Sequence, residues 1–141
     1  MPSRDLENLY QMLVDSQKGY EEAAEIADSA TIAEFFANRA RERADLIADF
    51  ASIVPGLPAA REEGTAIGAA HRLFINLRRM VQDDTKVALA EVERGESAFL
   101  TAIETALDDN DLVGEERQLV ADLHDEVRAD QSVFAEMRAT L

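Results

Sequence analysis

Residues 54–65 read VPGLPAAREEGT and contain two of the three prolines and two of the six glycines in a chain of 141 residues. Proline and glycine are the poorest helix formers, so this stretch predicts a loop. With so few helix breakers elsewhere, the sequence on either side can form long, uninterrupted helices. The sequence therefore predicts an all-α fold that this loop divides into two parts.

Two helices are predicted before the loop. Over residues 5–28, apolar residues recur at alternating spacings of three and four positions, which is the pattern of an amphipathic helix. A second apolar face covers residues 31–54, where Thr31 and Glu34 match a capping box at the helix start. Because only a few residues separate the two helices, we expect an antiparallel hairpin.

Three helices are predicted after the loop. A short stripe within residues 66–81 predicts one helix, a longer face ends near Leu107, and a last helix follows Gly114. The two long helices form a second hairpin, and roughly 30 residues separate it from the first, well above the usual length of a helix connection. This spacing predicts a ferritin-like four-helix bundle with a long crossover that carries the short helix. We expect residues 1–141 to form a single domain.

The charge of the chain excludes several classes of partner. Lys and Arg total 14 against 29 Asp and Glu, so the formal net charge is -15. Such a chain repels nucleic acids and anionic membrane surfaces, and neither is an expected partner. The sequence has no cysteine, no signal-peptide pattern and no long apolar run. We therefore expect a soluble, unprocessed, cytoplasmic protein without thiolate metal sites.

Polar residues interrupt the apolar faces near the middle of each long helix. With the helices drawn at about 100° per residue, these residues fall on or beside the apolar stripes and should face the bundle interior. In a bundle of four similar helices they would share one central layer. The members of this predicted polar layer are Ser16, Tyr20, Arg39, Arg43, Glu96, Asp130 and Gln131.

The simplest interpretation of the layer is a network of buried ion pairs. Glu96 and Asp130 would neutralise Arg39 and Arg43, and the other polar groups would complete the hydrogen bonds. Such a network would favour one helix register rather than add net stability. Two alternatives remain open, namely a small anionic ligand bound by the arginines and a metal ion bound by the carboxylates.

A di-iron or di-manganese centre matches the sequence poorly. In a bundle, such a centre uses one Glu from each of two helices and a Glu-x-x-His from each of the others. Gly68 lies three positions before His71 and Ala121 three before His124, so neither histidine completes the motif. No cofactor is therefore expected. The candidate ligands of any iron or manganese ion are Glu96, Asp130 and Glu42.

Four stretches of the sequence resemble one known family. They are KGYEEAAE (18–25), RARERADLIADF (39–50), GAAHRLFINL (68–77) and EVERGESAFLTAIETAL (91–107). They resemble the uncharacterised bacterial ferritin-like family called domain of unknown function 2383, over nearly the whole chain. The resemblance implies a ferritin-like bundle, often grouped with bacterial stress-associated proteins, and brings no established activity. Many relatives carry a histidine at the position of Gln131, where this chain departs from the family.

Three functions follow from these patterns. The sequence has no P-loop, nucleotide-binding glycine motif or nucleophile elbow, so no catalytic residue is assigned and a non-enzymatic protein is favoured. The first hypothesis is a bundle that acts as a homodimer or with a protein partner. It is based on apolar residues that the contacts between the helices should leave uncovered. A ferritin-like metal-binding protein or oxidoreductase is the alternative, and a small-ligand carrier is the second alternative. The residues expected to leave apolar surface are Tyr10, Val14, Phe74 and Ile75.

Overall fold

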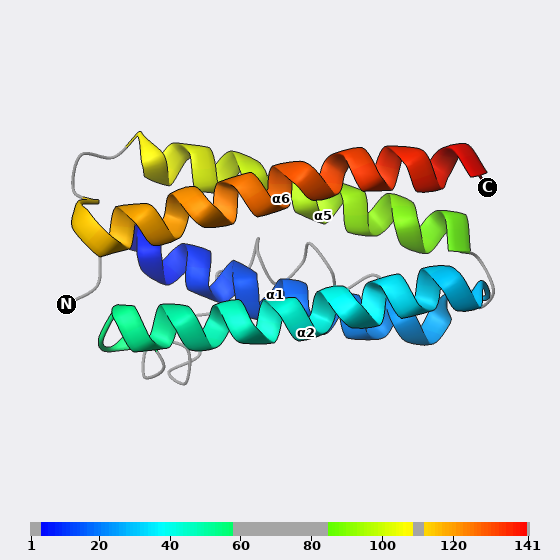
Figure 1. Cartoon of the computed structure of the whole chain (residues 1–141), viewed down its shortest axis with the longest axis horizontal. Helices are drawn as coiled ribbons and strands as arrows, with labels where there is room; N and C mark the ends of the chain where they lie inside the picture. The colour runs from blue at the N-terminus through cyan, green and yellow to red at the C-terminus, as the bar shows by residue number, and fades with distance from the viewer. Residues whose placement is uncertain (1–3, 58–84, 109–111, 141) are drawn as a thin grey trace.

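The computed structural model describes residues 4–57, 85–108 and 112–140, and this part of the chain folds into four long helices without strands (Figure 1). The all-α fold predicted from the sequence is thus confirmed. The helix predicted over residues 66–81 lies outside the described residues. The helices are α1 (Arg4–Ile26), α2 (Ala30–Ile53), α5 (Thr85–Leu107) and α6 (Gly114–Thr140).

The four helices pack as two antiparallel hairpins, α1 with α2 and α5 with α6 (Figure 1). Helix α1 also packs against α5, and α2 approaches α6 at fewer positions. Helices α2 and α5 run in the same direction, so the end of α2 and the start of α5 lie at opposite ends of the bundle. A simple up-down-up-down bundle would place these two points at the same end. The described helices therefore have the relative directions of α2 and α5 that the predicted long crossover requires.

The start of α2 differs from the sequence prediction. Ser29 is the N-cap, with an extended backbone, and its Oγ accepts a hydrogen bond from the N–H of Ile32 at 3.4 Å. The capping box predicted at Thr31 and Glu34 is wrong, because Thr31 already lies inside the first turn. Serine and threonine both cap helices well, so either residue could begin α2. Because α1 ends at Ile26, earlier than expected, the turn between α1 and α2 lies nearer the N-terminus and Ser29 becomes the cap.

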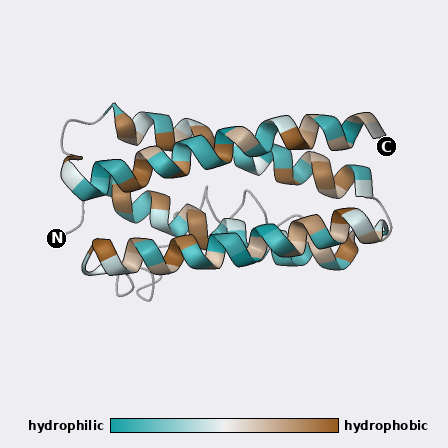
Figure 2. Cartoon of the chain, viewed as in Figure 1, coloured by the Kyte–Doolittle hydropathy of each residue, from teal (hydrophilic) through white to brown (hydrophobic). Residues whose placement is uncertain are grey.

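The apolar core is divided into two clusters. One contains Leu13, Phe99 and Val127, and the other contains Phe36 and Phe134. All four helices contribute to both clusters, and hydrophobic and hydrophilic residues are interspersed along each of them (Figure 2). No described helix is long and apolar enough to cross a membrane.

Helix α1 is buried on all sides over part of its length. Every residue from 9 to 16 is buried, and Tyr10 and Val14 are only 4% and 2% exposed. The expectation that these two side chains leave apolar surface for a partner is therefore wrong. Phe74 and Ile75 lie outside the described residues. Of the large hydrophobic side chains in the described helices and turns, Val87 and Val113 are the exposed ones.

Candidate functional site

Arg43 lies at the centre of the polar layer, between the two apolar clusters. Its side chain extends from α2 into the bundle and is fully buried. Nη2 lies 2.7 Å from Glu96 Oε1 on α5 and 3.6 Å from Asp130 Oδ2 on α6, and Nη1 donates to Ser16 Oγ on α1 at 3.1 Å. One guanidinium therefore contacts the other three helices and joins the two hairpins.

Aromatic rings surround the guanidinium where water is excluded. The Cζ atom of Arg43 lies 5.3 Å from the centre of the Tyr20 ring and 5.6 Å from that of Phe99. The negative faces of such rings attract a cation, and this attraction is larger when the cation is desolvated. Burial by itself would lower the pKa of Arg43, but the charge of Glu96, with Tyr20 and Asp130, raises that pKa above its usual value. Arg43 therefore remains charged.

Tyr20 connects α1 to the same carboxylate. Its hydroxyl donates a hydrogen bond to Glu96 Oε1, and both side chains are completely buried. Burial, together with the charge of Glu96, raises the pKa of Tyr20 well above its usual value. The hydroxyl therefore stays protonated and serves as a hydrogen-bond donor rather than a base. The Ser16 hydroxyl, in turn, donates to the carbonyl oxygen of Leu13 at 2.7 Å.

Arg39 lies at the edge of the layer, between α2 and α6. Its side chain is 20% exposed, with Nη2 at 2.9 Å from Asp130 Oδ1 and Nη1 at 2.5 Å from Glu42 Oε2. The guanidinium also lies over the ring of Phe35, at 4.7 Å from the ring centre. Arg39 thus lies between the buried part of the layer and the solvent, where α2 and α6 meet.

Two carboxyl groups of α6 have raised pKa values. Burial raises the pKa of Asp130 to about 6, against the opposing influence of Arg39 and Arg43 and with that of Glu96. Burial also raises the pKa of Glu126, which the charge of Arg43 opposes. The charge of Glu96 adds to the effect of burial at both of these carboxyl groups.

The structure brings most of the predicted layer together. Ser16, Tyr20, Arg43, Glu96 and Asp130 form one connected group of buried side chains, whereas Arg39 lies at its edge. Gln131, in contrast, is half-buried, and its Nε2 donates to Ser97 Oγ at 3.3 Å on the side of the α5–α6 hairpin.

Sequence reasoning missed two buried polar residues of α1 and a half-buried carboxylate of α6. Glu126 lies four positions before Asp130 and so on the same helix face, a spacing that could have identified it. Gln11 and Asp15 are buried on α1, and Gln11 Nε2 donates to Asp15 Oδ1 at 3.4 Å. Each of them directly follows an apolar residue, Tyr10 or Val14, that is itself buried. This second apolar side of α1 is the sequence signal that could have identified them.

The three candidate metal ligands do not fit a metal ion. The Glu42 side chain is 47% exposed and pairs with Arg39, while Glu96 and Asp130 both pair with Arg43. The guanidinium of Arg43 therefore holds the place that a cation bound by these two carboxylates would need. Within the described ranges, no group of three or more His, Cys, Asp or Glu residues is arranged to hold a metal.

The two histidines do not change this conclusion. His124 is half-buried, with Nε2 at 3.1 Å from Glu104 Oε2, and His71 lies outside the described residues. A small anion would also have to displace the carboxylates that already pair with both arginines. The chemistry of the layer is therefore that of an ion-pair network between two hairpins.

A family model for a domain of unknown function (DUF2383) matches residues 1–109 of the chain. The match covers α1, α2 and α5, and therefore Tyr20, Arg43 and Glu96, and it ends before Asp130 on α6. No curated protein and no solved structure matches the chain.

Proposed function

We propose a non-enzymatic binding role for this chain, which belongs to the uncharacterised DUF2383 domain family. The protein is a helical bundle that acts by associating with a protein partner or with a second copy of itself. The proposal includes the cytoplasmic location that the composition favours. An association with bacterial stress would follow from the family resemblance alone.

The observation that supports this role is the position of Arg43. Its guanidinium is buried at the centre of the bundle, 2.7 Å from an equally buried Glu96. In bundles that bind metals or cofactors, facing side chains at this depth hold the ligand. Here a cation of the chain itself engages the carboxylates, which favours a function carried out at the surface rather than in the interior.

The proposal is tested by the metal content of the protein. Protein purified without a metal-affinity tag should carry less than about 0.2 equivalents of iron, manganese or zinc, because the residues that the structure describes contain no complete ligand set. Elemental analysis measures this content. A second assay adds Fe(II) to the protein in air and records absorbance, with a ferritin as positive control.

Two outcomes separate the hypotheses. Absence of bound metal and of protein-dependent Fe(II) oxidation would agree with the binding role. Two bound transition-metal ions per chain, with oxygen-dependent absorbance changes, would overturn it in favour of a metal-dependent oxidoreductase. The comparison should include Arg43→Gln, with folding checked by circular dichroism. Metal binding by that variant alone would support the view that Arg43 occupies the position of a cation.

A further inference from the structure

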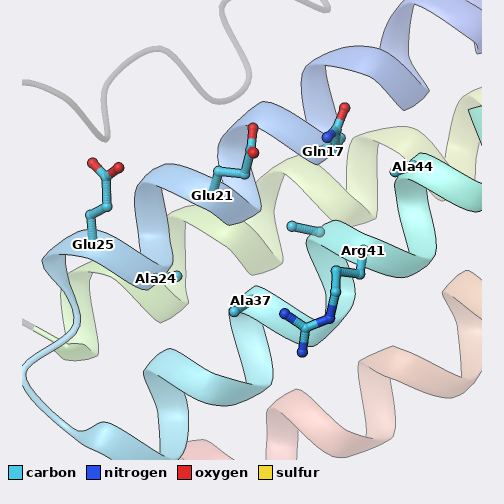
Figure 3. A pocket seen from close by; sticks show the side chains of 8 residues that line it. Gln17, Glu21, Ala24, Glu25, Ala37, Arg41 and Ala44 are labelled. Atoms are coloured by element: carbon cyan, nitrogen blue, oxygen red, sulfur yellow. The ribbon is translucent and has the colours of Figure 1, made fainter.

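A shallow groove follows the outer surface between α1 and α2, with about 670 Å³ of open space (Figure 3). Its inner wall consists of small side chains, including Ala24 from α1 and Ala37 and Ala40 from α2. Helices pack at axial distances of about 8 to 10 Å, and small residues at the contact permit the closer end of this range. Two such α1–α2 surfaces can therefore approach each other face to face without rearrangement of large side chains.

The two rims of the groove carry opposite charges. Glu21 and Glu25 project from α1, one turn apart, and Arg41 projects from α2 (Figure 3). All three side chains are exposed, and Arg41 donates a hydrogen bond to Asn38 of its own helix. Neither Glu21 nor Glu25 forms an ion pair with any residue that the structure describes. Among the described residues, the two rims thus carry charged groups that no ion pair across the groove joins.

We propose that this groove is the docking surface for a second copy of the chain, in a two-fold symmetric dimer. The inference rests on the proposed binding role and names its partner. A two-fold axis parallel to the helices, above the groove, places α1 of each copy over α2 of the other. Glu21 and Glu25 of one copy then face Arg41 of its partner, twice in the dimer.

Symmetry favours this arrangement over the alternatives. In a two-fold interface the same surface meets itself, so it must be self-complementary. An axis perpendicular to the helices would place α1 over α1 and bring the carboxylates together, which is unfavourable. A uniformly basic partner would match the acidic rim but would leave Arg41 facing a like charge. A second copy matches both signs.

The net charge of -15 opposes this association and makes it weak at low salt. At 0.15 M ionic strength, charges more than about 8 Å apart are largely screened, whereas ion pairs in direct contact are screened less. The long-range repulsion between two acidic copies is therefore reduced more than the attraction across the rims. We expect a dimer that forms reversibly as the protein concentration rises.

Sedimentation equilibrium at 0.15 M NaCl, up to about 100 μM protein, tests the proposal through mass action. The expected mass rises from 15.6 kDa toward twice that value. Arg41→Glu should weaken dimerisation by about tenfold or more, because it places like charges across both rims. The double variant Glu21→Arg with Arg41→Glu exchanges the two signs and should restore much of the affinity.

Arg128→Glu serves as the matched control, since it makes the same charge change at an exposed position of α6. Its dimerisation should stay close to that of the unmodified chain. Equal weakening by Arg128→Glu and Arg41→Glu would overturn the proposal, as would failure of the charge exchange to restore affinity in a folded protein. A chain that stays at 15.6 kDa and binds no metal would refute the second copy while leaving a protein partner as the function.

Discussion

Arg43 and Glu96 show how burial changes the energetics of a charged pair. Both side chains are almost completely removed from water, so each loses several kcal/mol of hydration that the ion pair has to offset. Tyr20 and Ser16 supply further hydrogen bonds that make this possible. The pair is consequently a weak source of net stability, but the loss of either partner leaves a buried charge without compensation.

This balance predicts the result of three substitutions. Glu96→Ala should lower the free energy of unfolding by about 3 to 5 kcal/mol, because it leaves the Arg43 guanidinium unpaired and opens a cavity. Arg43→Met should be similarly harmful. The double variant Arg43→Met with Glu96→Leu should recover most of the loss, because neither charge then remains to be desolvated. Urea denaturation provides the free energies. Losses under about 0.5 kcal/mol for both single variants would show that the pair is accessible to water.

Asp130 gives the layer a predictable dependence on pH. Its pKa is about 6 in the folded chain, above the ordinary value, so the folded state binds more protons between about pH 4 and 6. The free energy of unfolding should therefore increase as the pH falls from 7.5 to 5, by about 1 to 1.5 kcal/mol from this group. Glu126, whose pKa is also raised, acts in the same direction.

The variant Asp130→Asn should reduce this pH dependence, because it replaces the carboxyl by a group that does not titrate. Urea midpoints at pH 5.0 and 7.5 measure the effect. Asp125→Asn is the control, since it removes a carboxyl that is 86% exposed on the same helix. An unchanged difference between the two pH values in Asp130→Asn would show that another group is responsible.

The sequence predicted which residues of the layer face inward better than how deeply each one lies. The angular positions of Arg43, Glu96 and Asp130 on their helices follow from the period of 3.6 residues, which depends on backbone geometry alone. The exposure of Arg39 depends on the distance between α2 and α6, and that distance is a tertiary property. For the same reason, the position of Gln131 on α6 could not predict its hydrogen bond to Ser97 on α5.

At the level of the helices, the apolar periodicity predicted their number and direction in the described part, and the turns were less accurate. The bounds of α1 and α2 differ from the predictions by one or two residues at each end. Such shifts are usual, because the last turn of a helix depends on the competing caps nearby. The region around Ser29 contains several residues able to cap, including Asp28 and Thr31, so composition alone did not select one.

The start of α2 yields a prediction with an internal control. Ser29→Ala should destabilise the protein by about 0.5 to 1 kcal/mol, because it removes the acceptor for the Ile32 N–H. Thr31→Ala should change stability much less, since Thr31 is exposed within the first turn. Thermal and urea unfolding of both variants provide the comparison. The reverse order of effects would favour the capping box at Thr31.

For the molecule as a whole, the polar layer separates two apolar clusters that the same four helices build. Tyr10 belongs to the cluster with Leu13, and Tyr20 belongs to the cluster with Phe36. The ion pairs of Arg43 with Glu96 and Asp130 connect the hairpins between these clusters. Neither cluster can therefore lose its packing without disturbing helices that also form the other.

This continuity predicts a single unfolding transition, and the chain supplies its own probes because it has two tyrosines and no tryptophan. Tyr10→Phe leaves fluorescence from the Tyr20 cluster, and Tyr20→Phe leaves fluorescence from the Tyr10 cluster. Within each variant, the fluorescence midpoint should coincide with the midpoint from far-ultraviolet circular dichroism, which reports all helices. The unfolding midpoint of Tyr20→Phe should be lower than that of Tyr10→Phe, because Tyr20→Phe removes the hydrogen bond to Glu96. Fluorescence and dichroism curves that separate within a variant would instead show that the polar layer divides the bundle into two units that unfold independently.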